Sequence, residues 1–113
     1  MKYLLLMYAN QSEPPENAEE LYQAWTDFMK EANTAGGLVA NHGVAPGSSA
    51  TTLRIREGKS LITDGPFAET HEQLGGFSLI ECENLDEAIR WAEKVPTAKY
   101  GAIEIRPLWA PGQ

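Results

Sequence analysis

Residues Met1–Ala9 read MKYLLLMYA, a run that is apolar on both of its alternating faces. A half-exposed strand alternates apolar and polar residues, whereas a strand buried on both faces reads as a continuous apolar run. The run is far shorter than the roughly 20 apolar residues of a membrane span. No small-residue cleavage site follows it at a suitable distance. We therefore expect a central strand, and neither a signal peptide nor a membrane segment.

Two helices are predicted from paired capping signals. Asn17 is followed by Glu20, and Asn84 by Glu87, a spacing in which the Asn side chain caps the first turn and the Glu reaches back. A glycine pair ends the first helix and a proline follows the second. Apolar residues recur at helical spacing behind each cap: Ala18, Leu21, Tyr22, Trp25, Phe28, Met29, Ala32 and Ala35, then Leu85, Ala88, Ile89, Ala92 and Val95.

The remaining apolar segments are short and bounded by turn residues, which is typical of strands. Glu57-Gly58 is predicted to be a tight hairpin turn, after which Leu61 points inward. Glycines 75 and 76 are expected to precede a strand, and Pro107 to end the last one. The predicted strands are Leu38–Ala45, Thr51–Arg56, Lys59–Thr63, Phe77–Cys82 and Ala102–Arg106.

The order of these elements predicts a single domain, residues 1–113, with strand, helix and strand occurring twice. This arrangement favours an α+β sandwich of the ferredoxin-like, split β-α-β kind with an inserted hairpin. Two helices would cover one face of such a sheet and leave the other open. Because the first strand is apolar on both faces, a monomer would expose an apolar surface. We therefore expect a face-to-face homodimer.

Composition limits the partners and the compartment. Nine Lys and Arg against sixteen Asp and Glu give a formal charge of −7, which argues against direct binding of nucleic acid or of an anionic membrane. Cys82 is the single cysteine, so no internal disulfide forms, and a reducing cytoplasm is expected. No Cys and His residues recur at zinc-site spacing, so we expect no metal and no cofactor.

The most distinctive stretch is DGPFAET, residues 64–70. Asp64-Gly65-Pro66 has turn chemistry, because Asp can accept backbone N–H groups and Gly supplies a positive φ. The carboxylates of Glu69 and Glu72 lie beside His71 in the sequence, and a carboxylate next to an imidazole is a usable acid/base pair. The stretch is therefore either a structural turn with a solvated charged loop or part of a site.

Together with Thr63 and the segment Glu72–Phe77, this stretch resembles the YCII-related family in its DGPF branch. Met1–Leu6, Ala50–Arg54, Leu85–Ala88 and Tyr100–Pro107 agree with the resemblance. It implies a ferredoxin-like dimeric α+β barrel. Some members of the wider family are enzymes or carry a proposed His–Asp acid/base dyad, and some relatives are linked with sigma-factor-like domains.

The dyad does not transfer to this chain. The family's imidazole is expected on the first helix, about three turns before its terminal glycine, where this sequence has Trp25 and Thr26 and no histidine. Acid/base chemistry would then depend on other side chains. The candidates are Asp64, Glu69, His42 and His71 for catalysis, and Phe67, Trp25 and Arg54 for ligand binding.

Two functions remain open at this point. The first is a dimer with a pocket between helix and sheet, which binds a small organic molecule or performs cofactor-free acid/base chemistry on it. His42 would line that pocket if it faces the helices. The second is a non-catalytic accessory protein that engages a partner such as a sigma-type transcription factor. A closed pocket that holds a group of perturbed pKa would favour the first function, and an exposed apolar patch beyond the dimer face would favour the second.

Overall fold

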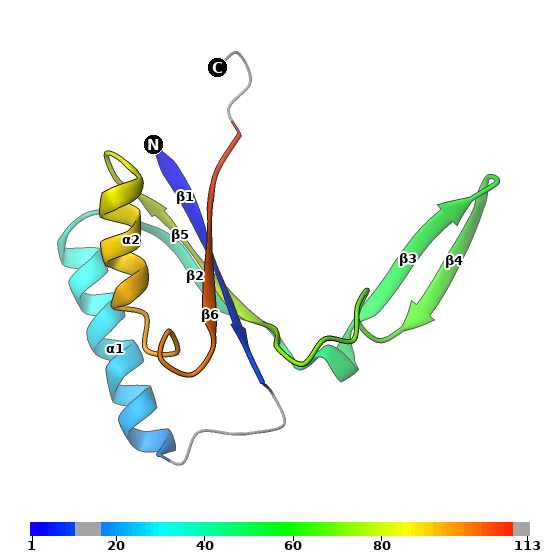
Figure 1. Cartoon of the computed structure of the whole chain (residues 1–113), viewed down its shortest axis with the longest axis horizontal. Helices are drawn as coiled ribbons and strands as arrows, with labels where there is room; N and C mark the ends of the chain where they lie inside the picture. The colour runs from blue at the N-terminus through cyan, green and yellow to red at the C-terminus, as the bar shows by residue number, and fades with distance from the viewer. Residues whose placement is uncertain (11–16, 110–113) are drawn as a thin grey trace.

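The computed structural model describes residues 1–10 and 17–109. Its elements follow the predicted order of strand, helix, strands, helix and strand (Figure 1). They are β1 (Lys2–Ala9), α1 (Ala18–Thr34), β2 (Leu38–Gly43), a 3₁₀ turn (Gly47–Ser49), β3 (Thr51–Arg56), β4 (Lys59–Asp64), β5 (Gln73–Glu81), α2 (Leu85–Glu93) and β6 (Ala102–Pro107).

Four strands form one antiparallel sheet in the order β2-β5-β1-β6, and both helices cover the same face of it (Figure 1). Alternate residues of β1, among them Leu5 with 0 % of its surface exposed, point into the layer between sheet and helices. Phe28 of α1 and Ala88 of α2 close that layer from the other side. The α+β class with its β-α-β elements is thus confirmed.

The other face of the sheet is not covered by either helix. Leu4 and Leu6 alternate with the core residues of β1, and they pair with Leu79 and Phe77 of β5. All four side chains are half-buried. We call the apolar surface made by these four residues the open face. The prediction of a strand that is apolar on both sides is confirmed. Within the described residues, the two helices cover only one of those sides.

The inserted hairpin is confirmed, but it does not belong to the core. Strands β3 and β4 form their own two-stranded sheet, which projects away from the rest of the molecule (Figure 1). We call residues 51–64 the arm and the remaining described residues the body. The expectation that Leu61 points inward is wrong, because its side chain is exposed. The predicted turn is present, with Glu57 at φ 52° and Gly58 at φ 75°.

Two local predictions need correction. Strand β5 starts at Gln73 and not at Phe77, because the glycine pair lies inside the strand, next to a register shift between Met7 and Tyr8 of β1. A bulge of this kind accommodates one extra residue without ending the strand. The strand β2 ends at Gly43, two residues before the predicted end.

The two capping patterns have different outcomes. Asn84 caps α2, since its Oδ1 accepts a hydrogen bond from the backbone N–H of Glu87 at 3.0 Å. The Glu87 carboxylate reaches back to the N–H of Glu83 at 2.9 Å. Asn17 makes no side-chain capping bond to α1, so that part of the prediction is wrong. Its backbone carbonyl still accepts from the N–H of Leu21 at 3.1 Å, which begins the helix.

Candidate functional site

A concavity of about 890 Å³ lies where the arm joins the body. Its volume falls within the range of small-molecule sites, roughly 300–1,000 Å³. We call it the arm groove. Its lining is largely apolar and has no charged side chain; it consists of Tyr8, Val44, Ala45, Pro46, Gly47, Ser49, Ala50, Thr51, Thr52, Leu53, Pro66, Phe67, Ala68, Thr70, Gln73 and Leu74.

The turn that begins at Asp64 forms one wall of the arm groove. Gly65 has φ +105°, its N–H donates to the carbonyl of Ala50 at 2.7 Å, and its carbonyl accepts from the Thr52 hydroxyl at 2.9 Å. A residue with a Cβ would be strained at that φ. These bonds tie the turn to the start of β3 and place Pro66 and Phe67 on the groove.

Asp64 itself is the last residue of β4 and pairs with Thr51 of β3. Its side chain is exposed, and no hydrogen bond or ion pair joins its carboxylate to the part of the chain that the structure describes. The turn is therefore formed by the glycine and by backbone bonds. The carboxylate is free to face solvent or a bound molecule.

Two of the three predicted ligand-binding residues meet at the rim of the arm groove. The Phe67 ring is 78 % exposed, and the Cζ of Arg54 lies 5.8 Å from its centroid, a cation–π contact. Trp25 lies elsewhere, on α1, with its ring edge-to-face against Phe28 at 5.9 Å between centroids. Trp25 therefore packs beside the helix–sheet core and not at the arm groove.

The two predicted histidines lie apart from each other. His42 of β2 pairs with Phe77, so it lies on the side of the sheet that faces away from the helices, with its ring centroid 5.8 Å from that of Phe77. It does not line a space between helix and sheet. His71, in the loop before β5, has its Nε2 3.2 Å from the Nδ2 of Asn10. Its neighbour Glu69 is exposed.

These placements leave no acid/base dyad among the four catalytic candidates in residues 1–10 and 17–109. No hydrogen bond joins any two of Asp64, Glu69, His42 and His71 in that part of the chain. A general base needs a hydrogen-bonded or water-bridged path to the proton that it removes, and a second group fixes its orientation. Neither arrangement is built from these residues within one chain.

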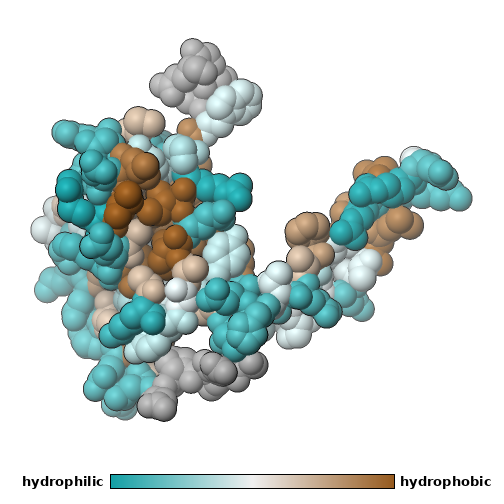
Figure 2. All heavy atoms as spheres, viewed as in Figure 1, coloured by the Kyte–Doolittle hydropathy of each residue, from teal (hydrophilic) through white to brown (hydrophobic). Residues whose placement is uncertain are grey.

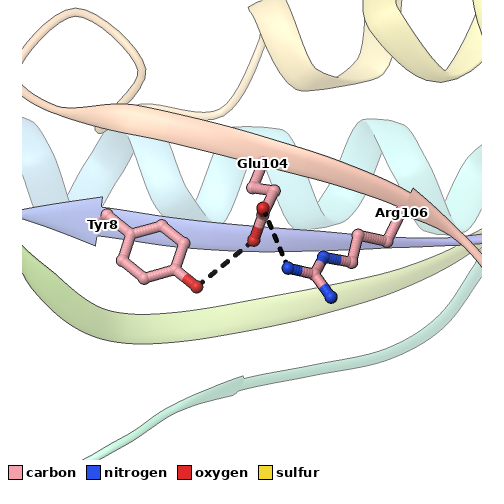
Figure 3. Close-up of polar contacts among 3 residues, drawn as sticks. All are labelled: Tyr8, Glu104 and Arg106. Atoms are coloured by element: carbon pink, nitrogen blue, oxygen red, sulfur yellow. Dashed lines mark hydrogen bonds and ion pairs between the residues drawn. The ribbon is translucent and has the colours of Figure 1, made fainter. Parts of the chain in front are cut away.

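Sequence reasoning missed a polar cluster that adjoins the arm groove. The Tyr8 hydroxyl donates to Oε1 of Glu104 at 3.3 Å, and Nη2 of Arg106 donates to Oε2 of the same carboxylate at 3.1 Å (Figure 3). Tyr8 also lines the groove. The signal was the alternation of Glu104 and Arg106 along β6, which places both on the side of the sheet away from the helices.

A second concavity of about 400 Å³ lies between α1 and the segment that follows α2. Its lining is strongly charged and includes the ion pair between Glu31 and Lys94. Surface ion pairs of this kind contribute little binding energy or stability. This concavity contains none of the predicted site residues.

The described residues offer neither a preformed cluster of metal ligands nor a membrane-spanning helix. No group of three or more His, Cys, Asp or Glu side chains in this part of the chain is arranged to hold a metal ion. Neither described helix combines the length and apolar character needed to cross a bilayer.

Comparison with known proteins gives the family. The sequence profile of the YCII-related domain matches residues 1–110. The chain belongs to the YCII-related family. It is also similar to an uncharacterized protein of Rhizobium meliloti (strain 1021), with 36 % identity over an alignment of 121 residues that covers 100 % of this chain and 98 % of that protein. The resemblance read from the DGPF stretch is thus confirmed at the level of the family.

Proposed function

We propose that this YCII-related protein is a homodimer that binds a small organic molecule in the arm groove. The observation that carries the proposal is the groove itself: an apolar hollow of about 890 Å³ with a few polar groups at its border. Small-molecule sites typically combine an apolar lining with a few polar groups that orient the ligand. Here Tyr8 and Thr70 supply hydroxyls, Gln73 supplies an amide, and Arg54 stands at the rim.

The open face supports the homodimer. Leu4, Leu6, Phe77 and Leu79 form an apolar surface that two copies would cover by packing face to face. Two ferredoxin-like sheets joined in this way make the dimeric α+β barrel that the family resemblance implies. A two-fold axis needs only one self-complementary surface, and the open face is a single continuous one.

Binding, and not proton transfer, is the activity we propose for the groove. Its lining has no carboxylate, imidazole or amine. The candidate catalytic groups lie outside it, and they are not hydrogen-bonded to one another in the described chain. An uncharged lining favours the apolar part of a ligand, because an unpaired charge is costly to bury. The buried free thiol of Cys82 is consistent with the reducing cytoplasm that we propose as its location.

The test is a titration with 1-anilinonaphthalene-8-sulfonate, whose fused rings are apolar and whose sulfonate would face Arg54. We expect fluorescence enhancement with the native protein and roughly fivefold weaker binding by Phe67→Ala, since a ring contact contributes on the order of 1 kcal/mol. Phe67 is exposed, so its loss leaves the fold intact. Native mass spectrometry of freshly purified protein would then identify the natural ligand.

Leu85→Ala is the matched control, because Leu85 is an exposed apolar residue of α2 that does not line the arm groove. Binding unchanged by Leu85→Ala and weakened by Phe67→Ala supports the proposal. Equal binding by the native protein and Phe67→Ala would contradict it, as would a loss confined to Leu85→Ala.

One observation favours the accessory role as a second candidate. The arm carries exposed apolar residues beyond the open face, which is the feature expected of a surface that engages another protein. A sigma-type factor is the partner implied by the family's relatives. Co-purification of such a factor with the native protein, lost on substitution of Ile62 by Asp, would support this role over ligand binding alone.

A further inference from the structure

One face of the arm is an exposed apolar stripe. Directly opposed residues of an antiparallel pair lie on the same face, so the pairs Leu53–Ile62 and Ile55–Ser60 share one. Leu53, Ile55 and Ile62 are 58 %, 62 % and 70 % exposed. We call these three residues the arm stripe. An isolated two-stranded hairpin is at best marginally stable in water, and soluble proteins avoid exposing contiguous apolar surface.

The opposite face of the arm is basic. Arg54 and Arg56 pair across the strands with Leu61 and Lys59, so all three cations lie on the face away from the arm stripe. The arm, residues 51–64, holds three of the nine Lys and Arg residues of the chain and two of its sixteen Asp and Glu residues. A cationic arm on an otherwise strongly acidic chain is complementary in charge to another copy of that chain.

The arm and the open face border the same space. In Figure 1 the helices lie on one side of the sheet and the arm extends on the other side, which is the side of the open face. Figure 2 shows apolar surface along the arm. A second copy seated on the open face would therefore meet the arm as well. The arm groove, lined by Leu53 and Phe67, lies at the corner between the two.

We propose that in the homodimer each arm packs its stripe against the second copy, and that this contact closes the arm groove. The inference rests on the homodimer proposed above and adds the role of the arm. Two-fold symmetry makes the contact reciprocal, so each protomer is clasped by the arm of the other. The ligand site is then complete only in the dimer, because one of its walls belongs to the partner.

The first test combines particle mass with proteolysis. Trypsin cuts after Arg54, Arg56 and Lys59, all of them on the arm. As protein concentration rises and light scattering reports twice the 12.4 kDa chain mass, cleavage at these sites should slow in proportion to the dimer fraction. A mass that doubles while the arm is cut as fast as in the monomer would overturn the proposal and leave the sheet-face dimer standing. A mass of 12.4 kDa at every concentration would overturn both.

The second test uses Ile62→Asp, with Thr63→Asp as its matched control on the same strand but on the other face. Ile62→Asp should raise the dimer dissociation constant roughly a hundredfold, since each dimer loses two buried isoleucines. Thr63→Asp should raise it far less. Both residues are exposed on the arm, so neither change disturbs the core of the body. Equal dimerisation by the two variants would contradict the proposed contact.

The third readout separates closure of the groove from dimerisation. Ile62 does not line the arm groove. If the partner closes the groove, Ile62→Asp should weaken binding of 1-anilinonaphthalene-8-sulfonate at concentrations where the native protein is dimeric. Unchanged binding of the probe by a monomeric Ile62→Asp protein would show that the groove is complete in one chain, which would overturn the closure while sparing the proposed ligand site.

Discussion

The body and the arm are built from the same kind of strand but have different sources of stability. In β1, Leu5 lies beneath the helices with 0 % of its surface exposed, whereas Ile62 of β4 is 70 % exposed. Both strands carry aliphatic side chains at consecutive positions, Leu4–Leu6 in β1 and Leu61–Ile62 in β4. What differs is a covering layer, which α1 and α2 supply for one face of the main sheet and which no described element supplies for the arm. The body therefore buries its core with its own chain, whereas the apolar residues of the arm stay exposed in a single chain.

The largest difference in stability should come from truncating one side chain in the body and one in the arm. Leu5→Ala should lower the free energy of unfolding by about 3 kcal/mol, because a buried leucine leaves a cavity. Ile62→Ala, studied where the protein is monomeric, should change it by less than about 0.5 kcal/mol. Urea denaturation measures both, and a loss of similar size in the two variants would mean that the arm is part of the core.

A glycine in each region gives the next contrast. A Cβ at Gly101 would lie 2.0 Å from the backbone oxygen of Tyr8, so Gly101→Ala forces the backbone of the body to shift and should cost about 1–3 kcal/mol. Gly58→Ala meets no atom within 4 Å but strains a φ of +75°. That strain falls on the arm. Thermal melting of the monomer should therefore drop for Gly101→Ala and stay nearly unchanged for Gly58→Ala.

A smaller effect tests local bonds within the body. Asn84→Ala removes the hydrogen bond that caps α2 and should cost about 1 kcal/mol. Asn17→Ala is the matched control, because Asn17 occupies the same position before α1 without a side-chain cap bond. It should cost a few tenths of a kcal/mol at most. Equal losses in chemical denaturation would show that the two caps are energetically alike.

The smallest effect is a pH dependence at Cys82. Burial, helped by the nearby Glu87 carboxylate, raises the pKa of its thiol above the usual range. The folded state then holds the proton more tightly than the unfolded state, so stability is unaffected below the thiol's ordinary pKa and falls as pH rises through it. Cys82→Ala should remove this alkaline loss. A native protein whose stability stays flat through the same pH range would contradict the assignment.

The sequence specified the body well because its signals are local or periodic. The apolar run Met1–Ala9 predicted a two-sided central strand, and the Asn84 pattern predicted both the start and the cap of α2. The start of β5 was missed because glycine pairs usually mark loops, whereas here they sit beside a bulge against β1. The arm was predicted as a hairpin with Leu61 inward, since periodicity shows which side chains share a face but not whether anything covers that face.

The candidate site was harder to predict. The sequence placed the pocket between helix and sheet, whereas the DGPF stretch lines the arm groove at the base of the hairpin, with Arg54 over the Phe67 ring. Tyr8 and Glu104 were not paired in advance, because they come from β1 and β6 and meet only through the register of the sheet. Trp25 had the right chemistry for a ligand site, but its helix packs it against Phe28.

The central claim is that the body is stabilised by its own chain and the arm by a second copy. Amide hydrogen exchange, followed by mass spectrometry at protein concentrations from nanomolar to tens of micromolar, tests this claim most directly. Exchange reports the free energy of local opening segment by segment. The account predicts that peptides from β1 and β5 are protected at every concentration, and that peptides from Thr51–Asp64 become protected only as the dimer forms. Arm protection that is the same in monomer and dimer would contradict it.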